Sequence, residues 1–259
     1  MQKIRLIKKY ILHLFLARHT NGFGVHSPFL FQFTQNVLCE KHPFYIFESI
    51  ELLRDKLIKD KRIISVTDFG TKPNRERKIT EIASSSLKSA KYGQLLFRIA
   101  HYFKSKDVLE LGTSLGITTS YLSSSSSKIN CVTLEGCAQT GSIAKENFEK
   151  IGLKNIELVI GNIDDTLPKF LEKSDTLDLI FFDANHKSEA VLRYFEMCQS
   201  KIHCTTILVV DDIYWSADME NAWQTIKKHP KVTSTIDLFE LGIVFFNPHL
   251  VKKHYKMLF

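Results

Sequence analysis

Three aspartates stand where two predicted strands end. Asp183 follows the apolar run 177–182, and Asp211 and Asp212 follow the run 207–210. Because an open α/β sheet binds ligands at the carboxyl ends of its strands, we expect these carboxylates to converge on one crevice. Unpaired carboxylates in one cleft repel one another, and a shared proton or a positive group relieves the repulsion. A hard divalent cation with oxygen ligands would meet that need.

A histidine lies beside the same predicted crevice. His186 comes three residues after Asp183. An imidazole takes up and releases a proton near neutral pH, which suits a general base. The alternative interpretation is structural, because His186 also stands where the predicted helix 187–200 begins and can cap it.

A glycine turn is the second group of residues whose types and spacing could serve ligand binding. The run 107–111 predicts a buried strand, and Gly112 and Gly116 bracket the turn that leads into a hydroxyl-rich helix. Strand, glycine turn and helix open a nucleotide-binding α/β domain. The spacing E-x-G-x-x-x-G, which begins at Glu110, differs from the glycine motifs of dinucleotide and phosphate sites. We therefore expect a nucleoside ligand without phosphates.

The motif 110–116 resembles the first motif of class I S-adenosylmethionine-dependent methyltransferases. The resemblance implies that the turn lies alongside the methionine part of the cofactor. An acid at the end of the second strand, Glu135, can accept both ribose hydroxyls; an ordinary helix-capping acid is the alternative. After the third strand, Asn162 and Asp164 are the candidates for the adenine amino group. The cofactor-binding residues expected in this way are Glu110, Gly112, Thr113, Ser114, Gly116, Glu135, Gly136, Gly161, Asn162, Ile163 and Asp183.

The carboxylate cluster resembles that of the metal-dependent O-methyltransferases of the catechol and caffeoyl-coenzyme A type. In that group an acid and an Asp-Asn pair hold magnesium, which acidifies the substrate hydroxyl. Carried over by position, the Mg²⁺ ligands would be Asp183, Asp211 and Asp212, and the catalytic residues His186 and Asp183. Asp212 stands where the family has asparagine, and His186 where it has lysine. A related group has a similar Asp-x-x-His pattern without clear metal dependence, so a metal-free site stays open.

The resemblance implies an enzyme that methylates the hydroxyl of a small molecule with S-adenosylmethionine. The alternatives are an N-methyltransferase and a non-catalytic, membrane-associated protein that retains the fold. Base methylation would favour an Asn/Asp-Pro-Pro-aromatic motif after the fourth strand, and the sequence there is Asp183-Ala-Asn-His186. No nucleic-acid partner is expected, because the positive charge is concentrated at one end of the chain. Tyr214 and Trp215 either border the acceptor or simply pack.

The elements that position these residues follow a regular alternation. Strands are expected near 107–111, 129–134, 156–160, 177–182 and 206–210, and helices near 116–124, 138–151, 166–173, 187–200 and 216–228. Such alternation predicts βαβ crossovers and a parallel sheet. A hairpin over 232–237 and 243–246 completes the sheet. The fold class is therefore α/β, a doubly wound seven-stranded sheet that is mostly parallel with the last strand antiparallel. A mainly helical N-terminal extension, 1–80, precedes a Rossmann-like methyltransferase domain, 81–259.

The composition suits a globular protein, with 44% hydrophobic and 24% charged residues in a chain of 259. Five cysteines without a C-x-x-C pair predict reduced thiols and a cytoplasmic protein. The segment His26-Ser27-Pro28-Phe29 resembles an N-terminal extension of some bacterial methyltransferases, and Ser27 and Pro28 predict the start of a helix.

The net charge of +7 is concentrated in the first twenty residues, which hold basic residues, no acid, and apolar residues at helical spacing. One interpretation is an amphipathic helix that packs on the main domain or on a second subunit, which would make a homodimer. The other is a basic helix on an anionic membrane surface. Packing is favoured, because an apolar stripe at helical spacing more often belongs to a core.

Overall fold

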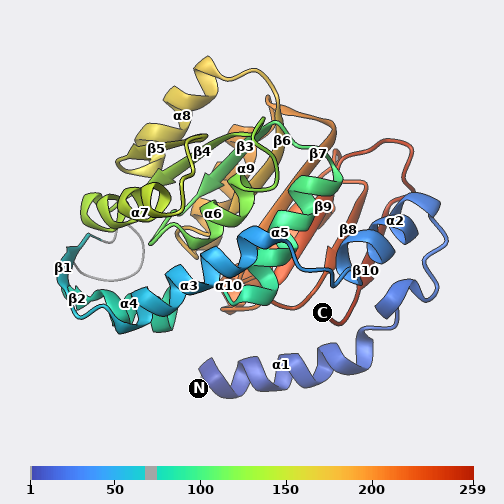
Figure 1. Ribbon diagram of the computed structural model, residues 1–259. Helices are drawn as coiled ribbons and strands as arrows, with labels where there is room; N and C mark the ends of the chain where they lie inside the picture. Colours follow the sequence, from blue (N-terminus) through green and yellow to red (C-terminus); the bar gives the residue numbers. More distant parts are fainter. Residues whose placement is uncertain (1, 68–74) are drawn as a thin grey trace. The chain divides into compact units, whose positions relative to one another are not determined.

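The computed structural model describes residues 2–67 and 75–259 (Figure 1). The chain divides into two compact units. The central unit is Lys41–Ser174, and the two-segment unit combines Met1–Glu40 with Asp175–Phe259. No helix in the described ranges has the length and apolar character that crossing a membrane requires.

The central unit contains three parallel strands in the order β3-β4-β5 (Figure 1). The strands are β3 (Asp107–Leu111), β4 (Asn130–Glu135) and β5 (Ile156–Ile160), and the helices after them are α6 (Ile117–Ser123), α7 (Ala138–Lys150) and α8 (Ile163–Lys173). Apolar side chains bury β3 completely along Val108–Leu111, as the sequence predicts for a strand covered on both faces. In the register, Glu110 lies opposite Thr133 and Glu135 opposite Ile160.

The first half of the central unit packs around aromatic side chains. Its elements are α3 (Tyr45–Lys59), the antiparallel pair β1 (Ile63–Val66) and β2 (Arg75–Lys78), α4 (Ile79–Ser86) and α5 (Ala90–Tyr102). Ile50 of α3 and Ile79 of α4 share one core with Phe97 and Tyr121. Buried aromatic rings of this size contribute much of a core's apolar area, so α3 and α4 are held to the unit by burial.

The two-segment unit carries five strands in the order β10-β8-β9-β7-β6. They are β6 (Leu177–Phe182), β7 (Ile202–Asp211), β8 (Ser234–Asp237), β9 (Leu241–Phe245) and β10 (Lys253–Lys256). β6 and β7 are parallel, whereas β9 runs antiparallel to β7 and to β8. The predicted α/β class with a mostly parallel sheet and an antiparallel hairpin strand is confirmed.

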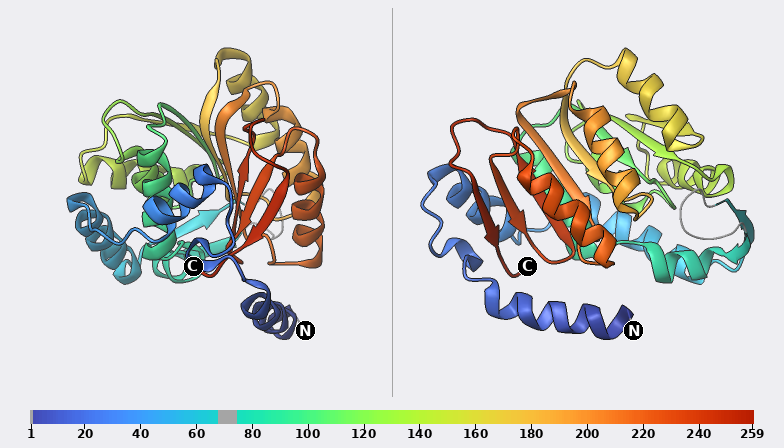
Figure 2. Two further views of the ribbon diagram at one scale, coloured as in Figure 1. Left: turned by 90° about the vertical axis from the view of Figure 1, so that its right-hand side faces the viewer. Right: turned by 180° about the vertical axis from the view of Figure 1, so that it is seen from behind.

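Helices cover both faces of these strands. The helices α9 (Ser188–Cys198) and α10 (Ala217–Lys228) lie on one face (Figure 2). Trp223 of α10 packs so closely on Gly242 that a Cβ there would meet the ring at 2.6 Å. On the opposite face, Phe33 at the end of α2 (Pro28–Phe33) meets the Phe245 ring edge-on at 5.3 Å. The predicted start of α2 is confirmed, since Ser27 caps it and Pro28 opens it.

Three local expectations differ from the structure. The helix α8 begins at Ile163 and not near 166, because the Asn162 side chain caps it by accepting from the Asp164 N–H. β7 begins earlier than expected, at Ile202. β10 was not expected at all; it pairs in parallel with β8, beyond the seven predicted strands.

The first helix contradicts the expectation that its apolar stripe packs on the main domain. α1 spans Gln2–Leu16, and His13 is its only buried residue in the structure described here. Its apolar residues, Phe15 among them at 74% exposure, face outward. A short 3₁₀ turn, Thr20–Gly22, and a π-helical turn, Thr34–Leu38, complete the N-terminal segment.

Candidate functional site

The glycine turn after β3 has the backbone geometry that the motif predicts. Gly112 has a φ of 100° and Gly116 a φ of 81°, both in the region that favours glycine. A Cβ on Gly116 would also meet the Phe148 ring at 2.5 Å. Ser114, between the two glycines, adopts a φ of 50°. The turn is therefore tight, and Gly112 and Ser114 are partly exposed in it while Gly116 is buried.

Glu135 holds this turn from the end of β4. Its Oε2 accepts from the Ser114 N–H at 2.7 Å, and its Oε1 accepts from the Cys137 N–H at 2.8 Å and from the Thr140 hydroxyl at 3.1 Å. Burial raises the pKa of the Glu135 carboxyl, while the N–H donors of Cys137 and Ser114 act to lower it. The side chain is only half-buried, and Oε2, which accepts from Ser114 alone among the contacts named, keeps a lone pair that can accept a ligand hydroxyl.

Glu110 behaves differently from Glu135. It is fully buried, and its Oε2 accepts from the hydroxyls of Thr119 and Thr133, the latter at 2.7 Å. Thr113 in the turn shares a hydrogen bond of 2.6 Å with Thr133. Burial raises the pKa of Glu110 to about 7. The observed contacts of Glu110 thus join β3, β4, α6 and the turn from within.

The end of β5 adds an apolar surface beside Glu135. Ile160 is 42% exposed and is the register partner of Glu135. Gly141 leaves room for it, because a Cβ there would meet Ile160 Cδ1 at 2.3 Å. Gly161 has a φ of 147°, and Asn162 uses its side chain to cap α8. Sequence reasoning missed Ile160, although an apolar residue at the end of a strand next to the predicted ribose acid was an available signal.

In the two-segment unit, His186 lies between two of the predicted carboxylates. Its Nε2 is 4.0 Å from Asp183 Oδ1 and 3.9 Å from Asp212 Oδ2. All three side chains are partly exposed, whereas Asp211 is buried at the end of β7. The imidazole therefore occupies the position between carboxylates where the sequence predicts a positive group or a shared proton.

Two loop residues hold unusual backbone conformations next to this histidine. Asp212 has a φ of 53° and Asn185 a φ of 46°. Residues other than glycine with such φ values are uncommon and cluster at functional sites. The Asn185 side-chain oxygen is buried and has no hydrogen-bond partner among the described residues. Asn185 is a second residue that sequence reasoning missed.

The predicted metal site is not formed by the side chains that the structure describes. Within residues 2–67 and 75–259, no three or more His, Cys, Asp and Glu side chains are arranged so that they could hold a metal ion. The Mg²⁺ ligand set Asp183, Asp211 and Asp212 therefore stays a prediction from resemblance. What the geometry offers is a histidine between Asp183 and Asp212.

The loop after β7 is fixed by α1. The Arg5 guanidinium donates to the Tyr214 carbonyl at 3.0 Å, and the Gln2 amide donates to the Trp215 carbonyl at 3.2 Å. Tyr214 is buried; its hydroxyl donates to Asp237 at 2.6 Å, so Tyr214 packs in the interior. Trp215 remains 46% exposed. No sequence signal links Arg5 to a loop more than two hundred positions away.

Comparisons with known proteins agree with this fold and these strand ends. Residues 109–213 match the family described as "Methyltransferase domain". A catechol O-methyltransferase of Niastella koreensis is 27% identical over 128 residues, which are 48% of this chain and 57% of that protein. The chain thus spans a little over half the length of the curated relatives that it matches.

Solved structures resemble the fold over most of the chain. An O-methyltransferase from Bacillus cereus in complex with SAH has a TM-score of 0.56 at 21% identity, covering 83% of this chain and 96% of that one. A Staphylococcus aureus protein assigned to the caffeoyl-CoA O-methyltransferases has a TM-score of 0.60 at 16% identity, covering 85% and 98%.

The fold and the strand-end residues thus agree with the predicted resemblance to class I α/β methyltransferases, and residues 109–213 match a methyltransferase domain. Within that class, the resemblance to the O-methyltransferases of the catechol and caffeoyl-coenzyme A type is confirmed.

Proposed function

We propose that the protein is an S-adenosylmethionine-dependent O-methyltransferase that acts on a small-molecule hydroxyl. The observation that carries the proposal is the tight glycine turn with Gly112 and Gly116 at positive φ, tied by its Ser114 N–H to Glu135 at the end of the adjacent strand. The family match over residues 109–213 includes both parts.

The residues of the central unit fit the nucleoside part of the cofactor. Glu135 offers the remaining lone pair of its Oε2 to the ribose hydroxyls, and the exposed Ile160 beside it offers an apolar surface to the adenine. Asn162 and Asp164 remain the candidates for the adenine amino group. Gly112, Thr113, Ser114 and Gly116 would line the methionine part, with Gly136, Gly161 and Ile163 as further neighbours.

The residues of the two-segment unit suit removal of the acceptor's proton. S-adenosylmethionine supplies an activated sulfonium methyl when it is bound. His186, with Asp183 and Asp212 each about 4 Å from its Nε2, would take the proton from the acceptor oxygen, and the carboxylates would stabilise the imidazolium that results.

The two alternatives receive less support. N-methylation has no base-recognition motif after β6, where Asp183 and His186 stand instead. A non-catalytic protein would have no need of the constrained turn at Gly116 or of the strained backbone at Asp212. A homodimer and a cytoplasmic location stay predictions.

Calorimetric titration with S-adenosylhomocysteine tests the proposal. The intact protein should bind it with micromolar affinity, and Glu135→Ala should weaken binding by at least about tenfold, roughly 1.4 kcal/mol. The exposed acid Glu149 of α7 provides the control, because Glu149→Gln should bind as the intact protein does. Absence of heat with the intact, folded protein would refute the cofactor assignment and favour the non-catalytic alternative.

A further inference from the structure

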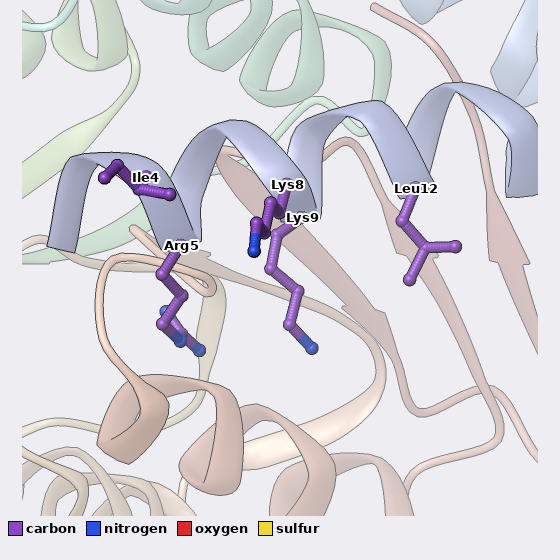
Figure 3. Close-up of a pocket in the computed structure, with 5 residues that line it drawn as sticks. All are labelled: Ile4, Arg5, Lys8, Lys9 and Leu12. Atoms are coloured by element: carbon purple, nitrogen blue, oxygen red, sulfur yellow. The ribbon is translucent and has the colours of Figure 1, made fainter. Parts of the chain in front are cut away.

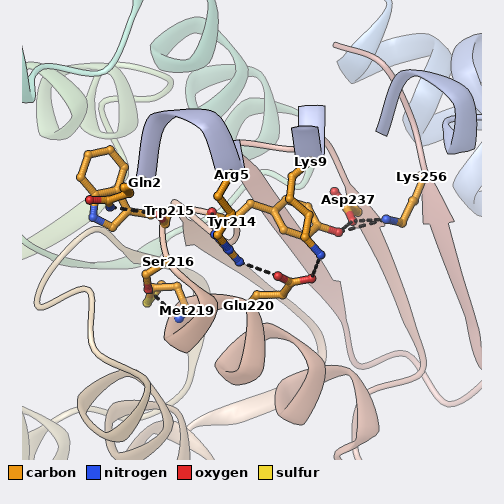
Figure 4. Close-up of polar contacts among 10 residues, drawn as sticks. All are labelled: Gln2, Arg5, Lys9, Tyr214, Trp215, Ser216, Met219, Glu220, Asp237 and Lys256. Atoms are coloured by element: carbon orange, nitrogen blue, oxygen red, sulfur yellow. Dashed lines mark hydrogen bonds and ion pairs between the residues drawn. The ribbon is translucent and has the colours of Figure 1, made fainter. Parts of the chain in front are cut away.

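The first helix is attached to the protein by its charged side. The Arg5 guanidinium and the Lys9 ammonium both donate to the Glu220 carboxylate of α10 at 2.6 Å (Figures 3 and 4). One turn further along α1, the His13 Nε2 donates to the Met257 carbonyl at 3.1 Å, and its Nδ1 lies 3.5 Å from Asp237 Oδ1. The positions 5, 9 and 13 share one face, because they are four residues apart on a helix.

The apolar side of α1 is consequently turned outward. Ile4, Ile7, Ile11, Leu14 and Phe15 are between 43% and 74% exposed. Their spacing of three and four residues places them in one continuous stripe. A surface helix of a globular protein normally buries such a stripe and exposes its charges. α1 does the reverse, so its apolar stripe lacks cover in the described structure.

Free positive charge borders this stripe. Lys3 and Lys8 are exposed, and Arg18 follows just after the helix. Glu220 neutralises only the inward cations, and α1 itself contains no acid. Lys8 also lines a surface hollow of about 420 Å³ together with the apolar Ile4 and Leu12 (Figure 3).

We propose that α1 docks the protein on an anionic phospholipid membrane surface. An exposed apolar stripe flanked by lysines is the pattern of helices that lie in the membrane interface, and the stripe would enter the acyl boundary while Lys3 and Lys8 meet lipid phosphates. Charge decides against a second copy of α1 as the occupant. Two such helices side by side would bring their lysines together with no acid on either helix to offset the repulsion.

The test uses the full chain and sedimentation with extruded vesicles. Vesicles of phosphatidylcholine and phosphatidylglycerol in equal parts should bind the protein, and pure phosphatidylcholine vesicles should bind it much less. Lys3→Gln with Lys8→Gln should weaken binding about 30-fold, since each basic residue near an anionic surface contributes ~1 kcal/mol. Ile7→Ser with Ile11→Ser should weaken it by at least about tenfold per side chain.

Matched variants separate the stripe from general surface chemistry. Lys169→Gln with Lys173→Gln removes two exposed lysines from α8, and Val251→Ser removes an exposed apolar side chain far along the chain from α1. Both controls should bind vesicles as the intact protein does, and circular dichroism should show unchanged helix content in every variant.

Two results would overturn the proposal. The first is an intact, folded protein that does not sediment with anionic vesicles. The second is an intact protein that is dimeric by analytical ultracentrifugation and becomes monomeric with Ile7→Ser and Ile11→Ser, without binding vesicles. That second result would assign the stripe to a second copy of the chain.

Discussion

Replacement of Glu110 by glutamine should remove a pH dependence of folding stability. Glu110 is fully buried, and burial raises its pKa from an ordinary 4.5 to about 7. Between these two values the folded protein retains a proton that the unfolded chain has released. The free energy of unfolding therefore falls as the pH rises through this interval, and the stability that protonated Glu110 provides is fully present only below about pH 4.5.

The size of the effect follows from the two pKa values. A difference of about 2.5 units corresponds to roughly 3 kcal/mol, because one unit is worth ~1.36 kcal/mol. Glutamine is neutral at every pH, and its amide oxygen can accept from Thr119 and Thr133 as the carboxyl does. The readout is the pH slope and not the absolute stability, because the amide N–H groups of the variant also need partners.

Urea unfolding at about pH 5 and about pH 8 measures this slope. The intact protein should lose roughly 2.5 kcal/mol more stability over that range than Glu110→Gln does, because pH 5 lies slightly above the lower pKa. Glu149→Gln, which removes an exposed carboxylate from α7, should keep the slope of the intact protein. Parallel pH curves for the intact protein and Glu110→Gln would refute the reasoning, because they would mean that Glu110 is not protonated on folding.

Two further substitutions test the glycine turn and the histidine. Gly116→Ala should lower the free energy of unfolding, measured in urea, by about 1–3 kcal/mol more than Gly152→Ala does. Both glycines have positive φ, but only a Cβ at position 116 would meet Phe148. Equal losses of stability would contradict the packing argument. His186→Gln should lower methyl transfer to a catechol-like diol about 10²–10⁴-fold with S-adenosylhomocysteine affinity unchanged. Full activity of this variant, lost on adding a chelator, would instead favour the predicted metal.

The sequence predicts most of the sheet because its signals are local. The strand 107–111 and its glycine turn are specified by an apolar run and by two residues that must adopt positive φ, and both are found where expected. β10 escapes prediction because Lys253–Lys256 is short and largely polar; its partner β8 is supplied by the tertiary fold.

The orientation of α1 could not be predicted for a related reason. Amphipathicity shows that a helix has two faces, but not which of them meets the protein. The choice depends on Glu220, which is separated from Arg5 by 215 positions in the chain. Likewise, the position of His186 between Asp183 and Asp212 depends on two loops that meet only in the folded unit.

Glu110 and Glu135 differ in how a ligand can reach them, because only Glu135 is partly exposed. Glu110 has no exposed surface, and its carboxyl group accepts hydrogen bonds from threonines inside the unit. We infer that it affects the cofactor only through the shape of the turn. Glu135 is partly exposed, and its Oε2 keeps a lone pair beyond the bonds that the carboxylate accepts from Ser114, Cys137 and Thr140. Substituting Glu110 should therefore change the pH dependence of the free energy of unfolding, whereas substituting Glu135 should change the affinity for the cofactor.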